Sequence, residues 1–109
     1  MEIKESDWKI FRKFHDLALE RYCQRMLAEV RLTVDNDDHN YHERYLKLWE
    51  LMRSRDKTVQ IAFDDPRRSQ MIIQISKHRR RGLLTESELN EFSEETRARI
   101  EGITSLRDS

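Results

Sequence analysis

The chain has 109 residues, of which 37% are hydrophobic and 39% are charged, and its 21 basic and 21 acidic side chains give a formal net charge of zero. This balance argues against a general polyanion-binding protein, although the charged share exceeds the typical value of about 25%. With only two glycines and one proline, the chain lacks the turn residues that a β-sheet needs, so we predict an all-α fold.

The length predicts a single helical domain over residues 1–103, followed by a frayed C-terminal tail over residues 104–109. The single cysteine, Cys23, rules out an intrachain disulfide and fits a reducing compartment. The N-terminus lacks the apolar segment of a secretory signal, and no apolar stretch is long enough to span a membrane. We therefore expect a cytoplasmic protein without a membrane partner.

The first predicted helix begins near Ser6, a suitable N-cap residue, and continues to about Thr33. Its N-terminal half is apolar on two sides, because Trp8 and Phe11 belong to one broad stripe and further apolar residues occupy a second side. Such a helix either sits centrally in a bundle or meets another chain, and the sequence leaves both alternatives open. The residues on the second side are Ile10, Phe14 and Leu17.

The second predicted helix covers residues 41–63, with Asn40 as its N-cap and Glu43 completing a capping box. The loop before it is short, so the first two helices should be antiparallel neighbours. Numbered at about 100° per residue, the helix has one apolar stripe that we expect to face the core. That stripe includes Tyr41, Tyr45, Leu48, Met52, Val59 and Phe63, with Trp49 at its edge.

A third helix is predicted from Pro66 to about Arg81, with Asp65 as its N-cap and Gly82 as the residue that ends it. Two shorter helices follow, one opened by a capping box and one capped by a serine that precedes an amphipathic segment ending near residue 103. The capping box is formed by Thr85 and Glu88, and the serine is Ser93. We therefore predict a small bundle of two long antiparallel helices, a third helix packed across them and one or two short C-terminal helices.

Protein–protein interaction, with a second copy of the chain or with another protein, is the function that this pattern favours. Aromatic and apolar residues on surplus helix sides support it, because tyrosine and tryptophan are enriched at interfaces. The candidate interaction surface consists of Trp8, Ile10, Phe11, Phe14, Leu17, Tyr41, Tyr45 and Trp49.

The alternative function is that of a small nucleic-acid-associated factor, because the third helix carries a basic stretch that suits phosphate contacts. Cations in the last turns of a helix also favour its dipole, and the acidic segment 86–95 that follows can fold back on them. The candidate phosphate-contacting residues are Arg67, Arg68, Lys77, Arg79, Arg80 and Arg81.

Catalytic and metal-binding patterns are weak in this chain, so we expect neither an enzyme nor a cofactor. His39 and His42 lie beside several aspartates in the loop near residue 38, but no second ligand pair with a recognisable spacing accompanies them. A polar loop with a helix cap explains these residues, so we predict no metal site. Cys23 has no base within reach and is expected to pack as a small hydrophobic residue.

Three stretches of the chain resemble a group of short bacterial proteins without an assigned function. They are residues 20–23 (Glu-Arg-Tyr-Cys), residues 63–69 (Phe-Asp-Asp-Pro-Arg-Arg-Ser) and residues 82–97, from Gly-Leu-Leu-Thr to Glu-Glu-Thr-Arg. The resemblance covers roughly residues 5–100 and contains no catalytic signature. It implies a small cytoplasmic helical protein and gives no substrate.

Overall fold

The computed structural model describes residues 2–108, and the side chains of residues 2–105. It is 79% helical and contains no strand in the described residues, which confirms the predicted all-α fold. No helix in that part of the chain combines the length and apolar character needed to cross a lipid bilayer. The helices are α1 (Glu5–Val34), α2 (Tyr41–Phe63), α3 (Met71–Arg80), α4 (Glu86–Leu89) and α5 (Glu94–Asp108), with a short 3₁₀ turn η1 (Arg68–Gln70) directly before α3.

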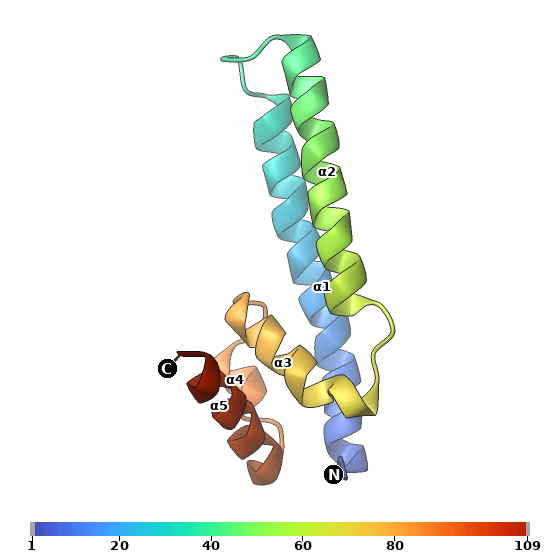
Figure 1. Ribbon diagram of the computed structural model, residues 1–109, viewed down its shortest axis with the longest axis vertical. Coiled ribbons are helices and arrows are strands. Elements are labelled where there is room, and N and C mark those ends of the chain that lie inside the picture. Colours follow the sequence, from blue (N-terminus) through green and yellow to red (C-terminus); the bar gives the residue numbers. More distant parts are fainter. Residues whose placement is uncertain (1, 109) are drawn as a thin grey trace. The chain divides into compact units, whose positions relative to one another are not determined.

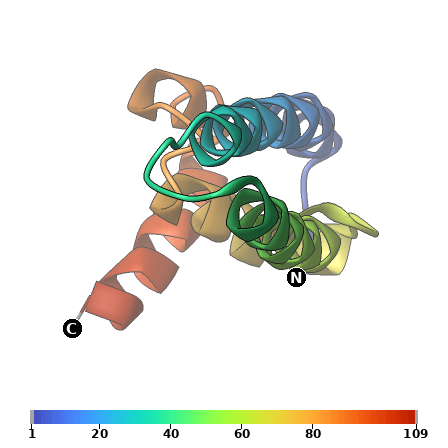
Figure 2. The ribbon, with the colours of Figure 1, turned by 90° about the horizontal axis from the view of Figure 1, so that it is seen from above.

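The chain forms two compact units that share α1. Unit 1 contains the part of α1 up to Ala18 and everything from Asp65 onward, so it includes η1, α3, α4 and α5. Unit 2 contains residues 19–64, which are the rest of α1, the following loop and α2. In unit 2 the two helices run side by side in opposite directions, which confirms the predicted antiparallel pair (Figures 1 and 2).

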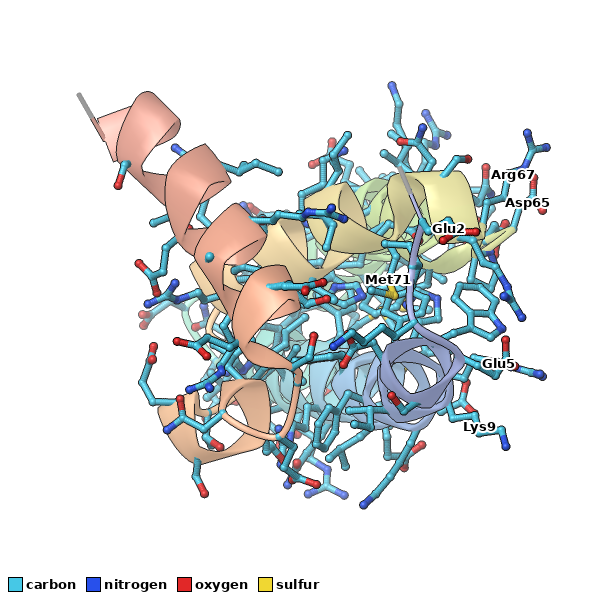
Figure 3. All side chains as sticks on the ribbon, turned by 90° about the horizontal axis from the view of Figure 1, so that it is seen from below. Glu2, Glu5, Lys9, Asp65, Arg67 and Met71 are labelled. Carbon is cyan, nitrogen blue, oxygen red and sulfur yellow. The ribbon has the colours of Figure 1, made fainter. Side chains whose placement is uncertain are left out.

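Unit 1 has a dry core to which every one of its α-helices contributes. The Phe14 ring from α1 meets the Phe92 ring edge-on, with 5.9 Å between the ring centroids. Met71 lies among the side chains between the helices, whereas Asp65 and Arg67 lie together at the edge (Figure 3). Large fully buried side chains of this core are Phe11, Met71, Ile75, Leu83 and Ile100.

Two capping boxes fix the starts of α2 and α4, as the sequence predicts. The Asn40 side chain accepts a hydrogen bond from the Glu43 N–H at 2.8 Å, and the Glu43 carboxylate accepts one from the Asn40 N–H. Thr85 and Glu88 make the same reciprocal pair before α4. Each box satisfies N–H groups that a helix start leaves without intrahelical partners.

Gly82 ends α3 in the predicted way. Its φ of 69° lies in the left-handed region that glycine adopts without strain. The Gly82 N–H donates to the Arg79 carbonyl and the Leu83 N–H donates to the His78 carbonyl, each at 2.9 Å. These are the two hydrogen bonds of a Schellman motif, and the buried Leu83 side chain supplies its apolar contact.

The start of the third helix differs from the prediction. Asp65 is not its N-cap, because α3 begins at Met71 and a 3₁₀ turn precedes it. Asp65 instead adopts a φ of 54° and pairs with Arg67 through its carboxylate. Its left-handed backbone turns the chain between α2 and η1, and this conformation is tolerated by aspartate better than by most side chains. The last helix also reaches Asp108, beyond the predicted end near residue 103.

The two glycines should respond oppositely to alanine. Gly82→Ala is expected to lower the free energy of unfolding by about 1–2 kcal/mol, because alanine is strained at a positive φ. Gly102→Ala should raise it by about 0.5–1 kcal/mol, since residue 102 lies inside α5 and an added Cβ meets nothing within 4 Å. Urea unfolding followed by circular dichroism measures both. Equal effects of the two substitutions would contradict this assignment.

Candidate functional site

The side of α2 that packs against α1 in unit 2 is marked by polar contacts. Arg55 forms a bidentate ion pair with Glu29, with its shorter nitrogen–oxygen distance at 2.6 Å. Near the loop, the Arg44 guanidinium donates to the carbonyls of Val34 and His39. Arg44 and Arg55 are eleven residues apart and therefore lie on the same side of α2. These arginines hold that side of α2 toward α1.

The aromatic residues of α2 lie outside this packing side. Tyr41, Tyr45 and Trp49 are 84%, 63% and 59% exposed. The expectation that the apolar stripe of this helix faces the core is therefore wrong for its first half. Tyr41, Tyr45 and Trp49 lie about 60–140° around α2 from Arg44, so they fall outside the side that packs against α1, and no other part of unit 2 covers them.

One group of apolar residues of α1 lies on the same side of unit 2 as the exposed aromatic residues of α2, whereas the exposed Leu32 lies on the other side. At about 100° per residue, this group is displaced by about 100–160° from Glu29 on α1, and the aromatic group by about 60–140° from Arg44 on α2, both in the direction of increasing residue number. Two antiparallel helices turn in opposite senses when viewed from one end, so displacements of the same sign bring both stripes to one face. We call this surface the hairpin face. Its residues are Leu27, Val30 and Val34 on α1 and Tyr41, Tyr45, Trp49 and Met52 on α2.

The hairpin face is large for an exposed surface of a monomer. Because an aromatic side chain covers about 150–250 Å² when buried, the exposed parts of Tyr41, Tyr45 and Trp49 alone amount to roughly 300–500 Å². The largest apolar patch on a typical monomer covers about 300–600 Å². Arginines lie over two of its rings, with the Arg44 guanidinium carbon 5.0 Å from the Tyr41 centroid and that of Arg53 5.6 Å from the Trp49 centroid.

The candidate interaction residues of the first helix do not belong to an exposed surface. Phe11 and Phe14 are buried in unit 1, so the structure contradicts their assignment to an interaction surface. Trp8, Ile10 and Leu17 are half-buried in the same unit. The N-terminal half of α1 is apolar on two sides because α3, α4 and α5 pack around it, which is the alternative of a central helix.

The basic stretch is largely engaged in ion pairs within unit 1. Arg67 pairs with Asp65 and Arg68 pairs with Glu5. Arg79 bridges two carboxylates, those of Glu86 at 3.1 Å and Glu101 at 2.6 Å, so the acidic segment does fold back on it. The Arg79 pKa lies above its usual value, first because of the hydrogen bond to Glu101. Of the remaining candidates, Arg80 is exposed, and Lys77 and Arg81 are half-buried. Binding to nucleic acid stays a prediction.

A carboxylate in the first turn of α1 is buried, which the sequence analysis did not predict. Asp7 accepts hydrogen bonds from the Ser93 N–H at 2.8 Å, the Ser93 hydroxyl at 2.6 Å and the Thr96 hydroxyl at 2.7 Å. Burial raises the Asp7 pKa, but these hydrogen bonds outweigh it and the pKa lies below its usual value. The carboxylate therefore stays charged, and it neutralises the N-terminus of α5.

A buried histidine pair links α1 to α3. The Nδ1 atom of His15 lies 2.9 Å from Nε2 of His78, which is hydrogen-bond distance. The pKa of His78 is lowered to about 3, first by burial and then by the charges of His15 and Arg81. Both rings are buried, so they fix the helices and are closed to a substrate.

A helical spacing argument locates both groups in hindsight. Asp7, Phe11 and Phe14 follow the spacing of one core stripe, and Met71, Ile75 and His78 follow another. A polar residue on such a stripe indicates a buried, partnered group. His78 therefore belongs with the core of unit 1.

The metal-ligand residue types do not converge on one point. Among the side chains of residues 2–105, no group of three from histidine, cysteine, aspartate and glutamate is placed to hold an ion. Glu43 caps α2 and also approaches His39 at 3.4 Å. Cys23 is a half-buried free thiol in unit 2.

Comparison of the chain with known proteins found no match: no family model, no curated protein and no solved structure matches it.

Proposed function

We propose that this chain is a protein–protein interaction module that forms a homodimer through the hairpin face. The observation that carries the proposal is the exposure of Tyr41, Tyr45 and Trp49 beside the exposed apolar residues of α1. A standard protein–protein interface buries about 800 Å² on each partner, and the three aromatic residues of the hairpin face supply about half of that area.

A second copy is the occupant that the architecture of unit 2 favours. Among residues 19–64, all of which the structure describes, only Ala62 and Phe63 are buried. A helix pair needs a further packed layer to bury its apolar side. Every copy has the same need and the same surface, which is the requirement for a two-fold symmetric interface.

Pairing of two hairpin faces would produce a four-helix arrangement with the aromatic rings at its centre. Tyrosine and tryptophan are the residues that dominate the energetics of such interfaces. The arginines that lie over Tyr41 and Trp49 can keep their charged ends at the rim while their stems cover the rings.

The test is the oligomeric state of a charged variant. Wild-type chain should sediment as a dimer at micromolar concentration, and Trp49→Glu should weaken the dimer by about 100-fold or more, because it places a charge in an apolar interface. Trp49 is exposed, so the variant should keep its helical circular dichroism spectrum. Sedimentation equilibrium measures both dissociation constants.

Leu32→Glu is the matched control. Leu32 is 75% exposed on α1, but on the side of unit 2 opposite to the hairpin face, so the substitution should leave the dimer unchanged. A wild-type chain that stays monomeric, or equal weakening by Leu32→Glu and Trp49→Glu, would refute the proposal.

A further inference from the structure

Unit 1 contains an apolar groove between α3 and α5 that is unrelated to the hairpin face. Its volume is about 540 Å³, within the range of about 300–1,000 Å³ that small-molecule sites occupy. Four isoleucines supply the apolar wall: Ile3 before α1, Ile72 and Ile73 on α3 and Ile103 on α5.

The polar groups at this groove have a single sign of charge. Arg68 and Arg99 line it, and its described lining contains no carboxylate. Arg68 pairs with Glu5 at the surface, where an ion pair contributes little and exchanges readily. Arg99 is half-buried, and within residues 2–105 no carboxylate pairs with it. A half-buried guanidinium beside an apolar wall is suited to an anion that carries an apolar chain.

Gly102 lines the groove and has no side chain to fill it. A Cβ built on this residue meets nothing within 4 Å, so the helix backbone itself borders the empty space. Glycine weakens a helix interior, and its presence here keeps room beside Arg99 that any larger side chain would occupy.

We propose that this groove binds a single-chain amphiphile with an anionic head group, such as a medium-chain fatty acid. The acyl chain lies along the isoleucine wall, and the Arg99 guanidinium binds the head group with two parallel hydrogen bonds. The Ser69 hydroxyl, which also lines the groove, is a second donor at the α3 side.

Decanoate below its micelle concentration is the probe, and Trp8 is the reporter. The Trp8 ring centroid lies 5.2 Å from the Arg68 guanidinium carbon, so occupancy of the groove should change its fluorescence. A Trp49→Phe background leaves Trp8 as the single tryptophan. We expect saturable binding of decanoate at one site per chain. Acetate lacks the acyl chain and decanol lacks the carboxylate, so each should bind at least about tenfold more weakly.

Two variants locate the site. Gly102→Leu should abolish decanoate binding while the unliganded protein melts at the same or a higher temperature, which separates filling of the groove from loss of the fold. Arg99→Gln should weaken decanoate by about tenfold and remove the preference for decanoate over decanol. Arg97→Gln is the matched control, because Arg97 lies on α5 but not at this groove, and it should bind as the parent does.

Several outcomes overturn the proposal. Undiminished decanoate binding to Gly102→Leu, or equal affinity for decanol and decanoate, would exclude an anion-selective site in the groove. Binding to phosphatidylglycerol vesicles without binding to free decanoate would assign the surface to a membrane and equally refute it.

Discussion

Asp7→Ala is expected to lower the free energy of unfolding of unit 1 by about 3 kcal/mol at neutral pH. The substitution removes the acceptor of three hydrogen bonds, and the donors on Ser93 and Thr96 lose a charged partner in a part-buried setting. It also removes a negative charge from the N-terminus of α5. Urea unfolding followed by circular dichroism measures the change.

Asp16→Ala is the control for that measurement. Asp16 lies on α1 in the same unit but is exposed, so its replacement should change the free energy of unfolding by less than about 0.5 kcal/mol. Thr96→Val, alone and combined with Asp7→Ala, isolates the share of one hydrogen bond in a double-mutant cycle. A loss below about 0.5 kcal/mol for Asp7→Ala would show that the carboxylate does not hold α5.

Acidification from pH 7 to pH 4.5 should destabilise the protein through His78. Its pKa is about 3 in the folded protein and near 6.5 when unfolded, so the unfolded chain binds the additional proton. The stabilisation is complete above pH 6.5 and declines as pH falls toward 3, by about 1.4 kcal/mol per pH unit. Asp7 adds a further loss at the acid end of this range, because its folded pKa lies below the ordinary value of 3.8 and its stabilisation is lost as pH falls below that value.

His78→Gln should flatten this pH dependence, because glutamine has no proton to gain. The variant should be less stable than wild type at pH 7, yet lose less stability between pH 7 and pH 4.5. His42→Gln is the comparison at an exposed histidine and should retain the wild-type slope. Urea midpoints at fixed protein concentration measure both, and a wild-type slope near zero in this window contradicts the role given to His78.

Local rules were enough to predict where several helices begin and end. The capping boxes at Asn40 and Thr85 and the glycine ending at Gly82 each depend on residues within a few positions of one another. Such interactions are complete within one turn of chain, so their geometry is encoded by adjacent side chains. The 3₁₀ turn before α3 was missed because Asp65 and Pro66 have the residue types of a helix start. In the structure Asp65 instead has a positive φ, and the α-helix begins only at Met71.

The side that each helix presents to its neighbour could not be read from apolar spacing alone. The pattern placed Tyr41 and Tyr45 in the core, whereas the side of α2 that faces α1 carries Arg55, which pairs with Glu29. That pair joins residues in different helices, and the residues near Glu29 or Arg55 in the sequence do not predict which side chain each will contact. The role of Asp7 could not be predicted for the same reason, because its hydrogen-bond partners Ser93 and Thr96 are distant in the sequence.

The candidate site shows the same division. Tyr41, Tyr45 and Trp49 were predicted as interaction residues and are exposed, whereas Phe11 and Phe14 were predicted with them and are buried. Both groups consist of aromatic residues three or four positions apart, as on one side of a helix. Only the presence or absence of covering helices separates them, and that depends on packing between distant segments.

The hydrogen bond between Asp7 and Ser93 joins positions 86 residues apart, so the parts of unit 1 become available for folding at different times during synthesis on the ribosome. The pairing of α1 with α2 depends on nearby segments and can form as soon as Phe63 has left the exit tunnel. Phe11 and Phe14 must wait for α3, α4 and the start of α5 to emerge before they are covered. During that interval both phenylalanine side chains of the nascent chain are exposed to solvent. We expect chaperones that bind exposed apolar segments to bind the chain at this stage.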